Sequence, residues 1–375
     1  MAQDIPLETI FIVAQRSAGR LRASYYFLRV ETARYHRCTY FLRIDDHDKI
    51  SSPKSKCFAR ELTMQVDIAN VKQRILVLGA GELGLSLLRG LAARRMSQDV
   101  SISVLLRHES LNGRESRKGG KIEEIRALGI AIELADLVGA TVAELAAVMA
   151  RYDTVISCVG FAAGRGTQRK LTEAALVAGV KRYFPWQFGV DYDLIGRGSP
   201  QDLFDEQLDV RDMLRSQHQT EWVIVSTGMF TSFLFEPSFG VVDLQAGRVN
   251  ALGSLDTAVT VTTPEDIGNL TAAIVLQAPR IANQVIYTAG DTLTYAELAD
   301  VVERVTGRSI ERREWSVQQL QAELTAKPDD TLCKYRAVFA MGRGVAWDVA
   351  KAYNTQHGMD VIGAEQWARE NLGRG

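Results

Sequence analysis

The spacing of apolar positions changes repeatedly after residue 71. Residues 75–78 are continuously apolar, as in a strand buried on both faces, and residues 83–94 are apolar at helical spacing. Further strand-like runs lie at 101–106, 130–133, 154–159, 183–184, 222–226 and 284–288. Helical segments between and after them begin near residues 121, 142, 168, 203, 264 and 294. This alternation predicts an α/β fold, a Rossmann-type doubly wound parallel sheet.

Several of these helices have recognisable start signals. The Thr-x-x-Glu spacing of a capping box occurs at residues 141–144 and 294–297. Thr263 stands before Pro264, which suits a capping residue followed by proline at the first helical position. These signals fix where three of the predicted helices should begin.

Three glycines follow the first predicted strand at the spacing G-x-G-x-x-G. The first permits a tight turn, the second lets backbone approach a pyrophosphate, and the third lets the helix pack closely on the strand. The helix N-terminus also offers unpaired N–H groups to phosphates. Glycines punctuate ordinary turns as well, but the position between a strand and a helix favours a dinucleotide site. The residues of that predicted site are Gly79, Ala80, Gly81, Glu82, Leu83 and Gly84.

The end of the second strand indicates which dinucleotide is bound. Arg107 stands about 20 residues after the last glycine, where an acid would select NAD and an arginine would accommodate the 2′-phosphate of NADP. A guanidinium can grip phosphate oxygens with two N–H groups. NADPH is therefore the expected cofactor, and the alternative is a solvated basic loop.

The fourth strand is expected to end at the ligand crevice of the sheet. Residues 157–160 read Ser-Cys-Val-Gly, and small residues there would let backbone come close to the nicotinamide ribose. Cys158 is not interpreted as a nucleophile, because a cysteine in an apolar strand is more often an inert core residue.

An aromatic segment at residues 181–193 is the candidate substrate pocket. Loops at the carboxyl ends of strands usually shape the substrate side of such sites. The pocket residues predicted from it are Phe184, Trp186, Gln187 and Phe188. Core packing could explain the three aromatic residues, whereas Gln187, Asp191 and Tyr192 are harder to assign to a core.

Together these motifs resemble a known family. The glycine turn, residues 157–160, Gln168 and the Phe-Pro-Trp-Gln-Phe-Gly run at 184–189 are similar to the NmrA-like, isoflavone-reductase-like branch of the atypical short-chain dehydrogenases. The resemblance covers about residues 71–372, and the run is most similar to that of a fungal isoflavone-reductase-like subgroup. That subgroup is often placed in secondary metabolism.

The resemblance implies an NADPH-binding Rossmann domain, a smaller C-terminal substrate-binding lobe, and reduction of a small aromatic or polyketide-like molecule. It also implies that the three glycines hold the pyrophosphate, while Arg107 and Lys118 meet the 2′-phosphate. The remaining cofactor-side residues expected from these motifs are Ser157, Cys158, Val159, Gly160 and Gln168.

Two departures from the plant reductases of this family bear on the chemistry. The glycine turn is one residue shorter than their Gly-x-x-Gly-x-x-Gly. In the Phe-Asp-Glu-Gln segment at 204–207, Gln207 stands where they carry a lysine, and an amide cannot donate a proton as an acid. The chain has no Tyr-x-x-x-Lys either. The proton could come from Tyr192, from a water held by Gln207, or from solvent, which makes these two residues the catalytic candidates.

Three functions are compatible with this sequence. The first is an NADPH-dependent reductase. The second is a dinucleotide-sensing regulatory protein, since NmrA itself binds dinucleotide and a partner protein without turnover. The third is a pathway protein that only chaperones an intermediate. Fold analogy does not separate them.

The composition and net charge indicate which kinds of partner and compartment to expect. The chain has 375 residues, is 46% hydrophobic and has a formal net charge of −1, which gives no attraction toward nucleic acid or an anionic membrane. No apolar stretch reaches the ~18 residues that span a bilayer. The four cysteines show neither a disulfide framework nor metal-ligand spacing. We expect a cytoplasmic protein with a small-molecule substrate and no metal.

The domain boundaries follow from these observations. Residues 1–70 are rich in arginine and aromatics. We interpret them as a poorly ordered extension or as a leader from a wrong start site, and we prefer both interpretations to a transit segment. Residues 71–230 form the predicted NAD(P)-binding Rossmann domain. Residues 231–375 form mainly the substrate-binding lobe, and a return of residues 255–290 to the Rossmann domain stays open.

Overall fold

The computed structural model describes residues 11–13, 23–32, 35–45, 73–95, 99–108 and 116–372, and the chain divides into two units, Met1–Val66 and Asp67–Gly375. In the first unit, an antiparallel sheet is formed by β1 (Phe11–Val13), β2 (Ala23–Thr32) and β3 (Tyr35–Asp45). Most of the extension predicted for residues 1–70 lies outside the described residues, and its interpretation stays a prediction.

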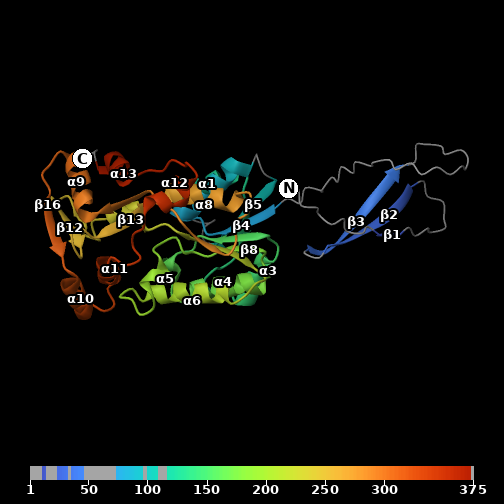
Figure 1. Ribbon diagram of the computed structural model, residues 1–375, viewed down its shortest axis with the longest axis horizontal. Helices are drawn as coiled ribbons and strands as arrows, with labels where there is room; N and C mark the ends of the chain where they lie inside the picture. The colour runs from blue at the N-terminus through green and yellow to red at the C-terminus, as the bar shows by residue number, and fades with distance from the viewer. Residues whose placement is uncertain are drawn as a thin grey trace, which may run out of the picture. The chain divides into compact units, whose positions relative to one another are not determined.

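In the second unit, seven described strands form one parallel sheet in the order β14-β9-β8-β7-β4-β5-β6 (Figure 1). The chain runs outward from β4 to β6 and then returns to place β7 on the other side of β4. This order confirms the predicted doubly wound Rossmann-type sheet and creates a switch point between β4 and β7. The strands are β4 (Gln73–Leu78), β5 (Val100–Leu106), β6 (Ala131–Leu134), β7 (Thr154–Ser157), β8 (Arg182–Phe184), β9 (Glu221–Ser226) and β14 (Gln284–Tyr287).

The central strand β4 is buried on both faces. Ile75 and Val77 belong to one core and Leu76 and Leu78 to the other, because successive strand residues point to opposite faces. The first core lies under α1 (Glu82–Arg94), α2 (Ser116–Ala127) and α8 (Pro264–Leu276). The second lies under α3 (Val142–Met149), α4 (Thr167–Val177) and α6 (Leu203–Arg215), on the opposite side of the sheet in Figure 1.

Helices α1 and α8 touch almost backbone to backbone. A Cβ at Gly268 of α8 would lie 2.5 Å from the Leu87 backbone nitrogen of α1, and a Cβ at Gly90 would lie 3.0 Å from Cβ of Ala272. Only glycine permits this approach. The contact brings α8 back onto the Rossmann sheet, where β14 then forms the edge strand next to β9.

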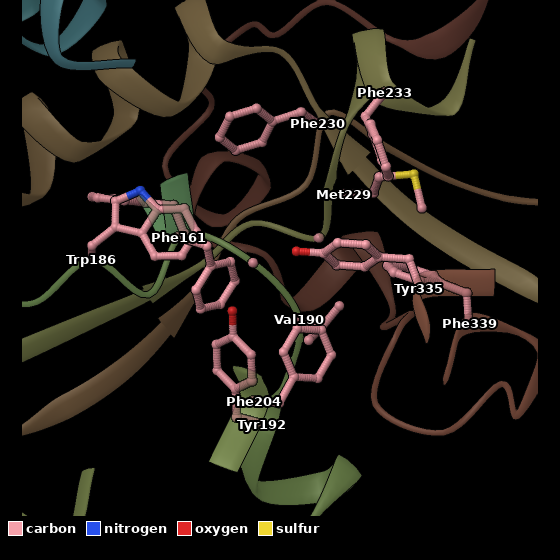
Figure 2. A pocket seen from close by; sticks show the side chains of 13 residues that line it. Phe161, Trp186, Val190, Tyr192, Phe204, Met229, Phe230, Phe233, Tyr335 and Phe339 are labelled. Atoms are coloured by element: carbon pink, nitrogen blue, oxygen red, sulfur yellow. The ribbon is translucent and has the colours of Figure 1, made fainter. Parts of the chain in front are cut away.

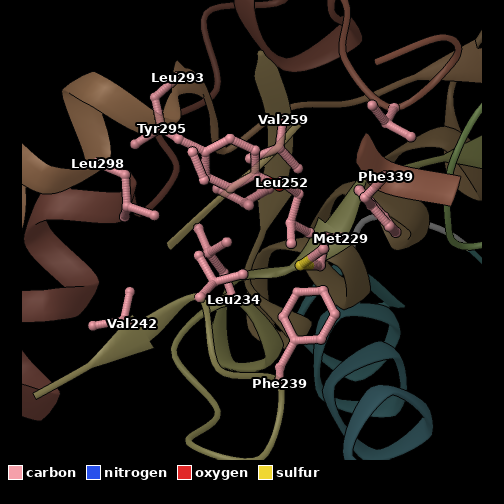
Figure 3. Close-up of a cluster of buried hydrophobic side chains, with 14 of the residues drawn as sticks. Met229, Leu234, Phe239, Val242, Leu252, Val259, Leu293, Tyr295, Leu298 and Phe339 are labelled. Carbon is pink, nitrogen blue, oxygen red and sulfur yellow. The ribbon is translucent and has the colours of Figure 1, made fainter. Parts of the chain in front are cut away.

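The rest of the C-terminal half builds a second lobe around two small sheets. One consists of β10 (Met229–Phe230), β13 (Ala258–Thr262) and β15 (Asp291–Thr294), and the other of β11 (Val242–Asp243), β12 (Arg248–Leu252) and β16 (Glu311–Trp315). Its core, shown in Figure 3, includes Leu234, Phe239, Val259 and Leu298. Its helices are α7 (Thr231–Leu234), α9 (Tyr295–Thr306), α10 (Val317–Ala326), α11 (Thr331–Ala340) and α13 (Ala364–Leu372).

The predicted helix starts are confirmed. Thr141 and Thr294 form complete capping boxes at α3 and α9, and the Thr263 side chain accepts a hydrogen bond from the Asp266 N–H at the start of α8. The strand predicted over 154–159 ends at Ser157. Among the helices that the structure describes, none has the length and apolar content needed to cross a membrane.

Candidate functional site

A cleft of about 690 Å³ opens at the switch point of the sheet. Its walls come from the turns after β4, β5 and β7 and from α2. Seven of the residues predicted to bind cofactor line it, namely Gly79, Ala80, Gly81, Arg107, Cys158, Val159 and Gly160. The carboxyl ends of the three strands therefore meet at one site, as a doubly wound sheet requires.

The three glycines of the turn perform different tasks. Gly79 has a backbone φ of +85°, which favours glycine. A Cβ at Gly84 would lie 2.3 Å from the Gly79 carbonyl oxygen, so that position is closed to any side chain. A Cβ at Gly81 would meet nothing within 4 Å. Gly79 and Gly84 thus shape the turn, whereas Gly81 keeps open the space that a pyrophosphate needs.

The start of α1 is suited to hold an anion. Gly81 is its N-cap and provides no side-chain cap, so first-turn N–H groups stay available to a phosphate. The side chain of Leu83 is buried in the core, so it does not contact ligand in the cleft. Partial burial raises the pKa of Glu82, and the nearby Glu265 carboxylate raises it further.

Two cations line the cleft toward the end of β5. Arg107 is exposed there, and Lys121 of α2 lies on the same wall. Lys118 is in the first turn of α2, and its side chain lies outside the described residues. Sequence reasoning missed Lys121, although it is three residues after Lys118 and hence on the same side of a helix.

The segment after β7 presents backbone to the cleft. Ser157 is fully buried beneath it, and burial raises the pKa of the Cys158 thiol, which fits the inert role expected of that cysteine. Gln168 is also buried, and its Nε2 donates to the Val159 carbonyl at 2.8 Å. Gln168 therefore holds the strand end in place and is not part of the cleft wall.

A second cavity, of about 240 Å³, adjoins this cleft. Gly160 lines the cleft and the next residue, Phe161, lines the cavity, while a Cβ at Gly160 would lie 3.2 Å from Cζ2 of Trp186. Figure 2 shows aromatic side chains on all sides of it. They include Phe161, Trp186, Phe188, Tyr192, Phe204, Phe233, Tyr335 and Phe339.

Two residues predicted for the pocket lie elsewhere. Phe184 points into the core under α1 and α8, where the Arg182 guanidinium lies 4.8 Å from its ring centre. Gln187 is buried behind the cavity, accepts a hydrogen bond from Nε of Arg211 at 2.7 Å and donates one to the Gln207 carbonyl at 2.8 Å. Proximity along the sequence did not reveal which face of the strand and loop each side chain takes.

The two catalytic candidates have different surroundings. The Tyr192 hydroxyl points into the cavity in Figure 2, and burial raises its pKa far above the ordinary value. Gln207 is fully buried and does not line the cavity, and its side-chain amide has no hydrogen-bond partner among the residues that the structure describes. The proton donor stays a prediction.

Comparison with known proteins shows which family has this architecture. The model of the NmrA-like family matches residues 71–341. An NmrA-like family domain-containing oxidoreductase of Gibberella moniliformis is 47% identical over 302 residues, which cover 80% of this chain and 98% of that protein. The chain belongs to the NmrA-like family.

More distant relatives of this NmrA-like protein include reductases. Phenylcoumaran benzylic ether reductase Pyrc5 of Pyrus communis is 27% identical over 263 residues, covering 68% of this chain and 83% of that protein. The complex of leucoanthocyanidin reductase with NADPH from Vitis vinifera has a TM-score of 0.65 at 19% identity, covering 79% of this chain and 98% of that one. This likeness shows that the fold is shared.

A buried polar network supports the cavity of the NmrA-like protein from behind. Arg211 of α6 is fully buried, donates to Asp193 at 2.6 Å and lies 5.4 Å from the Tyr192 ring centre. Asp191 accepts from two N–H groups of the following turn and from the Tyr287 hydroxyl at 2.7 Å. The network fixes the short helix α5 (Tyr192–Ile195), which Tyr192 begins. The sequence signal for Arg211 is a charge on the apolar face of an amphipathic helix.

We expect Gly81→Val and Gly84→Ala to separate binding from folding. Gly81→Val should remove NADPH binding with little change in thermal unfolding, because its side chain enters only the open cleft. Gly84→Ala should lower the unfolding temperature, because its methyl group would overlap the Gly79 carbonyl. Calorimetric titration and thermal scans measure both effects. An unchanged cofactor affinity in Gly81→Val would show that this turn does not hold the pyrophosphate.

Proposed function

We propose that this NmrA-like protein is an NADPH-dependent reductase of a small aromatic or polyketide-like molecule, acting in secondary metabolism. The observation that carries the proposal is the junction of two spaces. Gly160 lines the cleft suited to a dinucleotide, and its neighbour Phe161 lines the aromatic cavity. A substrate in the cavity would thus lie next to the end of the cleft.

The cleft fits NADPH on its own geometry. The open space at Gly81 and the uncapped N-terminus of α1 would hold the pyrophosphate. Arg107, with Lys118 and Lys121 of the adjoining helix, would meet the 2′-phosphate. The leucoanthocyanidin reductase from Vitis vinifera forms a binary complex with NADPH, which supports the same cofactor here. When bound, NADPH supplies the hydride.

The cavity side chains would bind, orient and shield the substrate. Trp186 and Phe161 pack edge to face, with ring centres 4.6 Å apart, between the cleft and the interior of the cavity. Their apolar surfaces would exclude water from the reacting carbon. Tyr192 would hold a proton at Oη over the same space, because a tyrosine hydroxyl is protonated at neutral pH and burial raises its pKa further.

One observation favours the alternative of a dinucleotide sensor without turnover. The described wall of the cavity has no lysine, histidine or carboxyl group, and Gln207 stands where related reductases carry a lysine. Against it, the cavity is a recess of small-molecule size rather than a docking surface. A sensor would need no such recess beside its dinucleotide.

Arg107→Ala should weaken NADPH far more than NADH, because only NADPH has a 2′-phosphate. We expect a loss of about 1.5–3 kcal/mol for NADPH. The matched control is Arg126→Ala, since Arg126 is exposed on α2 and does not line the cleft. Calorimetric titration with both cofactors gives the answer, and equal weakening of both would mean that Arg107 is structural.

Turnover is tested by following NADPH consumption with a panel of aromatic enones and ethers. If the proposal holds, at least one is reduced, and Tyr192→Phe lowers kcat by ~10²–10⁴ while cofactor affinity is nearly unchanged. Tight NADPH binding without turnover of any member would favour the sensor. Full activity of Tyr192→Phe on a verified substrate would remove Tyr192 as proton donor.

A further inference from the structure

The aromatic cavity contains very few polar atoms. Among its described lining residues no side chain is charged, and the polar side-chain atoms are the hydroxyls of Tyr192 and Tyr335 and the indole nitrogen of Trp186. Figure 2 shows both hydroxyls directed into the cavity from different sides. They come from the start of α5, which follows β8, and from α11, so the two halves of the second unit contribute one each.

Both hydroxyls are available as donors. Neither has a hydrogen-bond partner in the described part of the chain. Burial raises the pKa of Tyr335 to about 12, and it raises the pKa of Tyr192 further, with the nearby Tyr335 adding to that rise. Both groups therefore stay protonated at neutral pH. Because both hydroxyls face the cavity without a protein partner, a ligand that fills it should accept their hydrogen bonds, or they would be left unpaired.

Tyr335 is held firmly over the cavity. Arg336 donates to the carbonyls of Ser238 and Phe239 at 2.8 and 2.9 Å, and Lys334 binds Asp202 at 2.9 Å, next to the start of α6. The Tyr335 ring also packs against Phe233, with ring centres 5.7 Å apart. These contacts fix its hydroxyl relative to Tyr192 before any ligand binds.

We infer that Tyr192 and Tyr335 together hold one uncharged oxygen of the substrate, such as a ketone or enone carbonyl, between two donated hydrogen bonds. The inference rests on the proposed function, because it takes this cavity as the substrate site. Tyr335 is then a specificity residue contributed by the C-terminal lobe. The cavity selects aromatic molecules by the presence of a neutral acceptor oxygen.

The same wall rejects two other kinds of ligand. A hydrocarbon would bury both hydroxyls without acceptors, which is costly. A carboxylate would be buried without a cation, because the guanidinium behind the wall, Arg211, lies on the far side of the Tyr192 ring and is already paired with Asp193. Neutral acceptors are therefore preferred over both.

The test uses three probes with one styryl frame, each titrated into the full-length protein saturated with NADP⁺. Benzylideneacetone carries a neutral carbonyl, its diene analogue has a methylene group in place of the oxygen, and cinnamate carries a carboxylate. We expect benzylideneacetone to bind about tenfold more tightly than the diene, with cinnamate weaker than the ketone. Tyr335→Phe should weaken the ketone about two- to tenfold and leave the diene unchanged.

Tyr295→Phe is the matched control. Tyr295 is a fully buried tyrosine of the C-terminal lobe whose hydroxyl also lacks a partner among the described residues, but it does not line the cavity, so its removal should change no probe affinity. Equal affinities for ketone and diene, or a ketone affinity unaffected by Tyr335→Phe, would overturn the inference.

Binding and turnover fail independently in this design. If the ketone is preferred and Tyr335→Phe removes that preference while no compound consumes NADPH, the acceptor site stands and the reductase proposal falls. If NADPH is consumed but Tyr335→Phe binds the ketone as well as the wild type does, the reductase proposal is supported and the inference of two paired hydrogen-bond donors is wrong.

Discussion

The close packing of α1 against α8 joins the two halves of the second unit. Because Gly90 and Gly268 let two helix backbones meet, the chain can leave the Rossmann sheet after β9, build part of the second lobe, and return to the sheet. The return adds β14 at the edge of the sheet. Helix α8 thus connects β13 of the second lobe with β14 of the Rossmann sheet.

The aromatic cavity is a product of that arrangement. Met229 and Phe339 belong both to the core of the second lobe in Figure 3 and to the cavity wall in Figure 2. Trp186, in the loop after β8, packs against the core under α1 and α8. Tyr192, the first residue of α5, belongs to the same core as Met229 and Phe339. The cavity therefore lies where the two cores meet, and its wall includes a ring contact between Phe204 of α6 and Tyr335 of α11, with ring centres 6.1 Å apart. The polar side chains also differ between the two spaces, because cations line the cleft and neutral hydroxyls line the cavity.

Features encoded locally were predictable from the sequence. The strand and helix periods, the capping boxes and the glycine turn each depend on residues close together in the chain, and they placed the cleft with Arg107 at its wall. The pocket was predicted only in part, through Trp186 and Phe188. Phe184 and Gln187 belong to the same segment, but local pattern does not show which side of a loop faces a lobe built much later in the chain.

Long-range features were not predictable in this way. Tyr335 lines the cavity because α11, which is distant in the sequence from the other cavity residues, packs against it. The residues next to Tyr335 in the sequence do not distinguish it from a surface tyrosine. The burial of Arg211 depends likewise on Gln187 and Asp193 folding over α6. For Arg211 the sequence shows only a charge on the apolar face of a helix, and for Tyr335 it shows no signal, because the partners of both side chains are set by tertiary packing.

If this protein is a reductase, the cofactor in the cleft meets the substrate in the aromatic cavity. A crystal structure of the full-length protein with NADP⁺ would show whether they meet. We expect the pyrophosphate at Gly81, the 2′-phosphate beside Arg107, and the nicotinamide next to Gly160, with one face open to the cavity between Phe161 and Trp186. A nicotinamide directed away from that cavity, or an adenine end placed at Gly160, would contradict it.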